Sequence, residues 1–385
     1  MVPELQYDPT QATFQDQAYS IYRRLRDDHP VYHNAKHDFW ALSRFEDVRW
    51  AASSPDLFSS ENTSISIGLL PQIQQLDPPF HDRLRSLVST VFTPRRVAAM
   101  EPRIRAIARG LVADFGDDDC VDLMKHFARL LPSRVIGDMI GVPVERQESF
   151  LEWTEAMVSI EPNANQAENV QSPAASIYSE FSKLLEERRA DRRDDLMSAL
   201  IDAEIDGRKL TQEELLGFCF LLLVGGNDTT QNLIANGATL LGLHPEQQRL
   251  LADDPTAIPG AVEEMVRYES PTQALPRITT QDVTRHGITI PHGKEVLLVW
   301  GAANHDEREF EDPERFDVTR EIKRHLGFGV GVHFCLGSNL ARLEARVSFE
   351  ELLARFPRYA LDGEPRWLCS SWARAYGSVP VRPAG

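Results

Sequence analysis

One cysteine in this sequence stands in a setting that suits metal binding. Residues 325–337 read HLGFGVGVHFCLG, and the segment that follows Cys335 has the pattern of a helix. A free cysteine is most often a small buried hydrophobe, and that interpretation remains open here. The start of a helix, however, offers unpaired N–H groups that favour a thiolate, the form that binds soft metals. Gly329 and Gly331 would let the backbone approach a flat ligand, and Gly337 would permit a positive φ beside the sulfur.

A second group of unusual residues interrupts the most apolar segment of the chain. The sequence GGNDTTQ occupies residues 225–231, in the middle of a stretch that predicts a helix of about 30 residues through the core. Two adjacent glycines cost a helix roughly 2 kcal/mol relative to two alanines, and a buried Asp228 costs more unless it is paired. We therefore predict a functional kink, with the Thr229 hydroxyl bonded to the Gly225 carbonyl. The alternative is a tolerated glycine pair beside a solvent-facing acid.

Basic and acidic residues with helical spacing form a third group. Glu264 and Arg267 stand three residues apart and share one helix face, although most such pairs are solvated surface pairs. His81 and Arg85 are one helical turn apart, and Arg277 follows ten residues after Arg267. Each of these bases could equally be exposed and without a ligand.

The overall composition limits the classes of function. Lys and Arg number 41 and Asp and Glu number 58, so the net charge is −17 and neither nucleic acid nor an anionic membrane is expected as the main partner. Four cysteines, at 120, 219, 335 and 369, are too far apart to predict a zinc site or a disulfide framework. We find no signal peptide pattern and no apolar run long enough to span a membrane.

The elements that must position these residues are mostly helices. A Thr-x-x-Glu capping box at Thr211 and Glu214 starts the long apolar helix. Strand patterns occur at about 30–56 and 277–300, with a hairpin near the C-terminus. Two polar or mixed stretches, 57–77 and 155–170, are predicted to be loops. We expect a mainly α (α+β) fold in one domain, 1–385, with a small β-rich region and a long central helix.

The cysteine loop closely resembles that of a known family. FGVGVHFCLG is similar to the haem-binding loop of the cytochrome P-450 family, written Phe-Gly-x-Gly-x-His/Arg-x-Cys-x-Gly. Its positions are filled by Phe328, Gly329, Gly331, His333, Cys335 and Gly337. GGNDTTQ resembles the oxygen-activating signature of that family without departure. Shorter stretches along nearly the whole chain, such as DPPFH and ARLEARV, occur in the family's order.

The resemblance implies a cofactor and assigns residues to it. It implies haem b, with iron bound by the Cys335 thiolate and a central helix crossing over the haem. The residues implied to contact the cofactor or its propionates are His81, Arg85, Gly225, Arg277, Phe328, Gly329, His333 and Gly337. Asp228 and Thr229 are implied as a catalytic proton relay. Glu264 and Arg267 are implied to pair structurally with a loop residue, for which DPERF offers Arg315.

The implied activity is monooxygenation with O₂ and two electrons, in the manner of the soluble, cytoplasmic bacterial members of secondary metabolism. The sequence contains no flavin, nicotinamide or iron–sulfur fingerprint, so a separate ferredoxin and its reductase are expected as electron donors. The arginines expected to form a basic docking face on the cysteine side are Arg83, Arg95, Arg96, Arg342 and Arg346. A haem-dependent peroxygenase and a non-catalytic haem-based binder or sensor remain as alternatives, and both are disfavoured by the Asp228–Thr229 pair.

The residues expected to line the substrate pocket are mostly aliphatic. They are Ile65, Ile67, Leu69, Leu70, Met157, Leu223, Ala274, Leu275 and Trp372. Such a lining favours a small, apolar substrate such as a terpenoid, a steroid or a fatty chain, although the same residues could serve as ordinary core.

Overall fold

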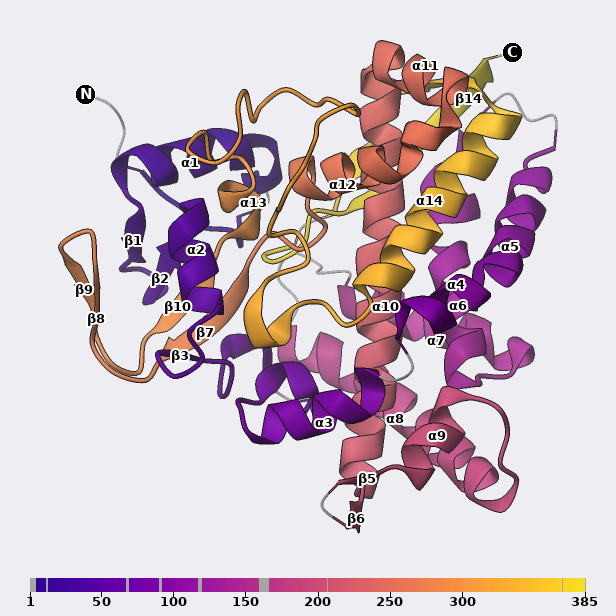
Figure 1. The fold of residues 1–385 in the computed structure, drawn as a ribbon, viewed down its shortest axis with the longest axis horizontal. Coiled ribbons are helices and arrows are strands. Elements are labelled where there is room, and N and C mark those ends of the chain that lie inside the picture. The colour runs from indigo at the N-terminus through magenta and orange to yellow at the C-terminus, as the bar shows by residue number, and fades with distance from the viewer. Residues whose placement is uncertain are drawn as a thin grey trace.

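Helices form most of the molecule, and a small sheet lies at one side (Figure 1). The structure is a computed structural model that describes residues 5–11, 13–66, 69–89, 92–116, 120–158, 166–205, 207–368 and 370–384. About 55% of it is helical. The predicted fold class, mainly α with a small β-rich part, is therefore confirmed.

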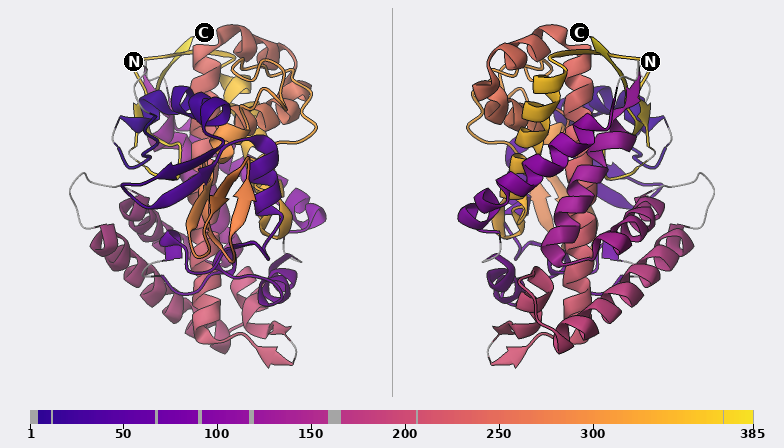
Figure 2. Two further views of the ribbon diagram at one scale, coloured as in Figure 1. Left: turned by 90° about the vertical axis from the view of Figure 1, so that its left-hand side faces the viewer. Right: turned by 90° about the vertical axis from the view of Figure 1, so that its right-hand side faces the viewer.

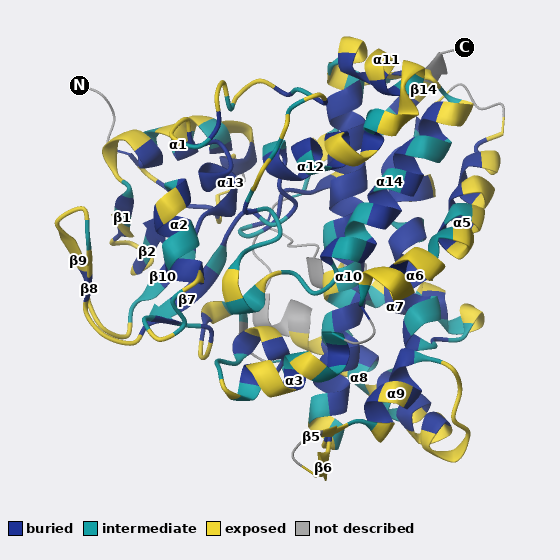
Figure 3. Cartoon of the chain, viewed as in Figure 1, coloured by how far each residue is buried: buried dark blue, intermediate teal, exposed yellow. Residues whose placement is uncertain are grey.

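The long apolar segment forms α10, Gln212–Leu243, which crosses the whole molecule from end to end (Figures 1 and 2). Its start is the predicted capping box: the Thr211 and Glu214 side chains each accept a hydrogen bond from the other's backbone N–H, at 3.2 and 2.7 Å. Leu215 near one end and Leu241 near the other are both buried, and Figure 3 shows the upper half of α10 as almost wholly buried. A helix apolar on all sides must be surrounded by other elements.

The helices around α10 complete the main core. Its main neighbours are α6 (Leu130–Ile140), α14 (Ser338–Arg355), α12 (Ile258–Tyr268) and α8 (Gln166–Ala190). The other helices of that part are α3 (Phe80–Ser89), α4 (Pro94–Ala99), α5 (Glu101–Ala113), α7 (Val144–Val158), α9 (Leu196–Asp202), α11 (Pro245–Asp253) and the π-helical turn η3 (Met124–Ala128). Packing along α10 therefore fixes the level at which its central residues lie.

The small sheet combines segments from both halves of the chain, as predicted. Its order is β1-β2-β10-β7-β3. The bounds are Val31–Asn34, Phe39–Leu42, Glu295–Leu298, Leu275–Thr279 and Phe58–Ser59 in that order. β10 pairs in parallel with β2 and antiparallel with β7. The helices α1 (Phe14–Asp28), α2 (Phe45–Ala52) and α13 (Trp300–Ala303) and the hairpin β8–β9 (Val283–Arg285, Ile288–Ile290) belong to this side of the molecule (Figure 1).

Short strands near the C-terminus replace a simple hairpin. β11 (Arg358–Leu361) pairs with β14 (Pro380–Ala384), which also pairs with β4 (Val121–Asp122). β12 (Arg366–Trp367) pairs with β13 (Tyr376–Ser378), and β5 (Glu204–Ile205) pairs with β6 (Arg208–Lys209). The C-terminal strands thus fasten α14 to the region before α6.

Two predictions about loops need correction. The predicted loop at 155–170 is shorter, because α7 continues to Val158 and α8 begins at Gln166 with Pro173 inside it. The 57–77 stretch contains β3 and two 3₁₀ turns, η1 (Ser64–Ser66) and η2 (Ile73–Gln75).

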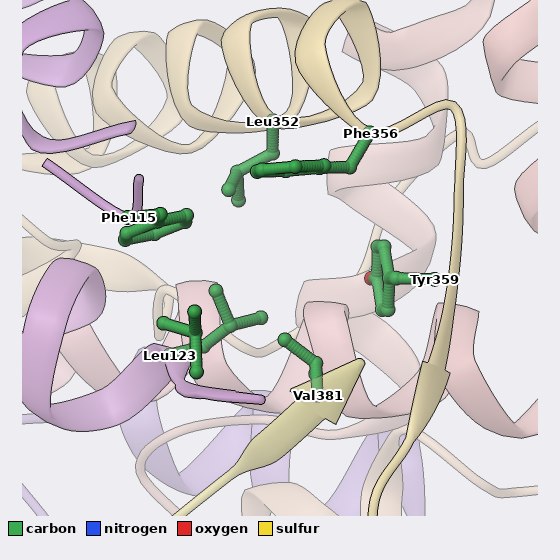
Figure 4. Close-up of a pocket in the computed structure, with 7 residues that line it drawn as sticks. Phe115, Leu123, Leu352, Phe356, Tyr359 and Val381 are labelled. Carbon is green, nitrogen blue, oxygen red and sulfur yellow. The ribbon is translucent and has the colours of Figure 1, made fainter. Parts of the chain in front are cut away.

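A small apolar cavity lies between the end of α14 and the C-terminal strands (Figure 4). Its volume is about 10 Å³, and Phe115, Leu352, Phe356 and Tyr359 are among the residues that line it. That is about the minimum space for one water molecule, so we regard it as a packing defect. Among the described helices, none combines the length and hydropathy needed to cross a bilayer.

Candidate functional site

The cysteine loop is held by backbone hydrogen bonds on both sides of Cys335. The Cys335 N–H donates to the Phe328 carbonyl at 2.9 Å, which closes the loop on itself. Phe328 and Leu336 pack against the main core, while the short turn η5 (Gly331–His333) approaches α2. The loop therefore lies between the sheet side and the α10 side, as Figure 1 shows.

The glycines of the loop play different roles from one another. Gly329 and Gly331 have φ of 67° and 77°, so both adopt the left-handed conformation that favours glycine. A Cβ on Gly331 would also lie 2.6 Å from the Ala52 carbonyl oxygen. The positive φ predicted for Gly337 is wrong, since its φ is −84°. A Cβ there would meet no protein atom within 4 Å, so the missing side chain leaves open space beside the sulfur.

Two opposing effects act on the Cys335 sulfur. Burial raises the pKa of the thiol above its ordinary value. The backbone N–H groups of Gly337 and Ser338, at the start of α14, lower that pKa, as predicted for a helix start. The charges of Arg85 and Arg342 also lower it. Burial prevails in the protein alone, and a metal cation at the sulfur would favour the thiolate.

Four basic side chains gather near this loop. The rings of His81 and His333 have centroids 4.3 Å apart. Burial, and then the nearby charge of Arg277, lowers the pKa of His333 to about 3. Arg85 donates a hydrogen bond to the carbonyl of Phe334, next to Cys335. The four bases predicted from separate parts of the sequence are thus neighbours in space.

Two of these bases have no close anionic partner among the described residues, whereas Nδ1 of His81 lies 2.8 Å from the Asp82 carboxylate. In the described part of the chain, neither Arg85 nor Arg277 has a carboxylate oxygen within 4.0 Å. Burial lowers the pKa of Arg277 to about 10, and the buried Nε2 of His81 has no hydrogen-bond partner. A ligand with two carboxylates would neutralise this group and satisfy its donors. The group therefore fits the two propionates of haem.

The centre of α10 offers a second open surface. The Thr229 hydroxyl donates to the Gly225 carbonyl at 2.8 Å, as predicted. Asp228 is only 1% exposed, which excludes the alternative of a solvent-facing acid. A Cβ on Gly226 would press on Ile136 of α6 at 3.1 Å, whereas one on Gly225 would meet only Leu221 at 3.6 Å. α10 is one uninterrupted helix from Gln212 to Leu243, so the predicted kink does not break the helix.

The predicted structural pair is completely buried. Glu264 and Arg267 are both 0% exposed and form two hydrogen bonds of 2.6 and 2.8 Å. Arg267 also donates to the carbonyls of Asn304 and Pro313, at 2.9 and 3.0 Å. This pair ties α12 to the segments that precede the cysteine loop.

The third member of this group is Arg320, and the prediction of Arg315 is wrong. The Arg315 side chain is 63% exposed and lies 3.5 Å from Asp317. Arg320 Nε lies 3.3 Å from the Glu264 carboxylate, and its other nitrogens donate to the carbonyls of Glu311, Asp312 and Arg315. The turn within DPERF, closed by the hydrogen bond from the Arg315 N–H to the Asp312 carbonyl, leaves the Arg315 side chain exposed, which sequence spacing alone could not reveal.

The predicted substrate-pocket residues are distributed over several parts of the structure. Ile65, Leu69, Leu70, Leu275 and Trp372 are partly buried. Leu223 and Ala274 are each 3% exposed and belong to packed cores, while the nearby Leu221 and Val224 are only partly buried. Ile67 and the side chain of Met157 lie outside the described part of the chain. The packed positions of Leu223 and Ala274 favour a core role over the predicted lining role.

Sequence reasoning missed three residues at this site. Ser60 shares a 3.0 Å hydrogen bond with Nε2 of His333, Arg320 reaches Glu264, and Glu263 contacts both His325 and Arg342. Ser60 follows a strand in FSSE, and Glu263 directly precedes Glu264. Only their proximity to known motifs could have indicated them, because no spacing rule connects residues so distant in sequence.

The fold and the site together define a haem-binding protein with a cysteine loop opposite a long central helix. A sequence profile described as Cytochrome P450 matches residues 256–368. The chain is also 40% identical over 368 residues to the Vitamin D(3) 25-hydroxylase of Pseudonocardia autotrophica, covering 92% of this chain and 90% of the relative. The chain belongs to the cytochrome P450 family.

Solved structures agree with this assignment. Cytochrome P450 CYP109Q5 from Chondromyces apiculatus is 38% identical and superposes with a TM-score of 0.90 over 98% of both chains. CYP109E1 from Bacillus megaterium, solved in complex with testosterone, is 32% identical with a TM-score of 0.91 over 96% of this chain and 99% of that one. The protein is therefore a haem-dependent monooxygenase that uses O₂ and electrons from redox partners. Relatives named as hydroxylases favour this activity over the peroxygenase and sensor alternatives.

Proposed function

We propose that Cys335 is the haem iron ligand in this monooxygenase. The observation that carries the proposal is the setting of its sulfur. The backbone N–H groups of Gly337 and Ser338, at the start of α14, lower the pKa of the Cys335 thiol. Bound haem supplies the iron at which O₂ is reduced, and a thiolate ligand favours O–O cleavage. Phe328 and Gly329 shape the loop, while Gly337 leaves the space beside the sulfur open.

The basic group holds the cofactor in one orientation. His81, Arg85, Arg277 and His333 would bind the two propionates, because in the described part of the chain neither Arg85 nor Arg277 has a carboxylate oxygen within 4.0 Å, and cations in that position gain most from an anionic ligand. Ser60 supports this arrangement through its hydrogen bond to His333. Binding of the propionates should raise the pKa of His333 from about 3, since the new charge opposes the effect of the neighbouring cations.

Asp228 and Thr229 would hold and move protons at the centre of α10. The Asp228 carboxyl is almost completely buried on α10, and the Thr229 hydroxyl is one residue further along on a partly open surface. Gly225 leaves room beside that hydroxyl, because a Cβ there would meet only Leu221, at 3.6 Å. A buried acid followed by a hydroxyl could pass a proton from the protein interior to the partly open surface at Thr229.

The substrate is proposed to be a small apolar molecule of steroid or lipid type. Ile65, Leu69, Leu70, Leu275 and Trp372 supply partly buried apolar surface around the expected pocket. One relative is named as a vitamin D(3) hydroxylase and another was solved in complex with testosterone, and both names are consistent with a substrate of steroid type. A ligand screen for a spin-state shift of the haem should give responses with sterols or fatty acids and none with sugars or nucleosides.

We also propose a ferredoxin and its reductase as the electron donors, in the cytoplasm. On α4, Arg95 and Arg96 are exposed. A groove of about 320 Å³ beside them is lined by α4, α12 and α14. Arg342 and Arg346 contribute less to this basic face than predicted, because each forms ion pairs with glutamates.

The carbon monoxide difference spectrum of the reduced protein tests the iron ligand. The wild type and a Cys120→Ser control, altered at an exposed cysteine, should both give the red-shifted Soret band of a thiolate-bound haem. Cys335→Ser should lose that band even where it retains haem. An unchanged band in Cys335→Ser would overturn the proposal.

A further inference from the structure

Glu263 precedes the buried Glu264 on α12 and makes a separate set of contacts. Its carboxylate pairs with Arg342 through two hydrogen bonds, of 2.6 and 2.9 Å, and with Nε2 of His325 at 3.0 Å. The side chain is 27% exposed. Partial burial alone would raise the pKa of Glu263, but the hydrogen bonds from His325 and Arg342 lower it to about 2. The carboxylate therefore remains charged across the working pH range.

His325 connects Glu263 to the start of the cysteine loop. The Gly327 N–H donates to Nδ1 of His325 at 3.0 Å, which places the ring proton on Nε2, where it faces Glu263. The His325 side chain is 5% exposed. A Cβ on Gly327 would lie 2.8 Å from the Val266 carbonyl oxygen, so the loop already touches α12 at this point. The imidazole is thus held in one tautomer and one position.

Arg342 connects Glu263 to the other end of the loop. Its guanidinium carbon lies 4.3 Å from the centre of the Phe328 ring, within range of a cation–π contact. The Phe328 carbonyl in turn accepts the Cys335 N–H. The positive charge of Arg342 also acts directly on the Cys335 sulfur. Through Arg342, the Glu263 carboxylate therefore affects both the position of Phe328 and the net charge near the Cys335 sulfur.

We propose that Glu263 is a positioning residue for the cysteine ligand: by bridging His325 and Arg342 it fixes the loop and offsets the Arg342 charge at the sulfur. The inference rests on the proposed ligation of iron by Cys335. Loss of the Glu263 charge would leave Arg342 without its counter-charge, so the sulfur would donate less electron density and the ferric state would be less favoured. Loss of the Arg342 charge would act in the opposite direction.

The haem reduction potential provides the test, measured by redox titration of the purified holoprotein. Glu263→Gln should shift the potential to more positive values, and Arg342→Gln should shift it to more negative values. Glu263→Asp keeps the charge and should restore most of the wild-type potential. A purely structural disturbance would not give shifts of opposite sign, so the sign distinguishes the two explanations.

Glu350→Gln is the matched control. Glu350 is 21% exposed on α14 and pairs with Arg105 and Arg346, but it has no hydrogen bond to the cysteine loop. Its variant should keep the wild-type potential. Shifts of the same sign in Glu263→Gln and Arg342→Gln, or a Glu350→Gln shift as large as that of Glu263→Gln, would overturn the inference. The Cys335→Ser spectrum tests the ligand separately, so a wild-type potential in Glu263→Gln would refute this inference alone.

Discussion

At the scale of single residues, buried charge indicates the site most clearly. Arg277 is 6% exposed, and among the described residues no carboxylate oxygen lies within 4.0 Å of it, whereas the fully buried Arg267 has Glu264 beside it. A buried cation without a partner is costly, and a folded protein retains such a group where a ligand supplies the anion. The contrast between these two arginines separates a cofactor contact from a structural ion pair.

Asp228 carries a prediction at this scale. Asp228→Asn keeps the shape of the side chain but removes its ability to carry a proton, so turnover should fall by about 100-fold. Haem content and the spectrum of the reduced carbon monoxide complex should remain those of the wild type. The rate of product formation, with surrogate ferredoxin and reductase, measures the effect.

Thr230→Val serves as the control for this prediction. Thr230 is 3% exposed on the same turn of α10 and has no role in the proposed relay. A Thr230→Val protein should turn over within about threefold of the wild type. Equal losses in both variants would show that the relay is not specific to Asp228.

At the scale of elements, the connection between α12 and the segment before the cysteine loop determines where the ligand lies. The Glu264 carboxylate forms ion pairs with Arg267 of its own helix and with Arg320 of that segment. Gly327 packs closely against Val266, two residues further along α12. The loop is therefore positioned by one helix through both ion pairs and close backbone contact, which a flexible loop alone could not provide.

Arg320 carries the prediction at this scale. Arg320→Ala removes an ion pair to buried Glu264 and three hydrogen bonds to backbone carbonyls. Because Arg267 still neutralises Glu264, we expect a loss of roughly 1–3 kcal/mol in the free energy of unfolding. Urea unfolding followed by circular dichroism measures it.

Arg315→Ala provides the comparison for Arg320→Ala. Its side chain is 63% exposed, so the free energy of unfolding should change by less than about 0.5 kcal/mol. If Arg315→Ala proved the more destabilising of the two, the original sequence-based assignment would be restored.

At the scale of the whole molecule, net charge and local charge have different consequences. The chain carries −17 overall, yet Arg95 and Arg96 are exposed on α4 beside the groove described above. An acidic electron carrier would be repelled by most of the surface and attracted here. Electrostatic guidance of this kind affects association rates and is weakened by salt.

Reversing the charge of this face should slow reduction. Arg95→Glu combined with Arg96→Glu should lower the rate of reduction by an acidic ferredoxin by about tenfold at low ionic strength, with a smaller difference at high salt. Stopped-flow reduction measures the rate. Arg193→Glu, at a 54% exposed site before α9, should leave it unchanged, and equal rates in all three proteins would contradict the proposed docking face.

The whole molecule should also become less stable in acid because of one buried histidine. Burial, and then the charge of Arg267, lowers the pKa of His305 well below its ordinary value of 6.5. The unfolded chain therefore binds a proton below pH 6.5 that the folded protein does not. Stability is lost as the pH falls below 6.5, by up to about 1.4 kcal/mol per pH unit from this group.

His305→Gln removes this titration and should flatten the decline. Urea midpoints of the wild type and the variant, compared at pH 7.5, 6.5 and 5.5, should differ progressively more as the pH falls. His292→Gln, altered at an exposed histidine, should follow the wild type. Parallel declines in His305→Gln and the wild type would show that His305 does not contribute.

The sequence by itself determined the elements whose signals are local. The capping box at Thr211 starts α10 because the two side chains and two N–H groups that form it lie within four residues. The Thr229 bond to Gly225 and the Glu264–Arg267 pair follow in the same way from helical spacing. The glycine-rich loop identified the family because its pattern is complete within ten residues.

The tertiary structure alone decided what depends on contacts between distant segments. It placed Arg320 rather than Arg315 at Glu264, put Leu223 and Ala274 in the core, and joined Glu263 to His325 and Arg342. Side-chain direction after a turn, and the sharing of one carboxylate by several cations, depend on packing between elements. Such features follow from close packing in three dimensions and leave no fixed spacing in the chain.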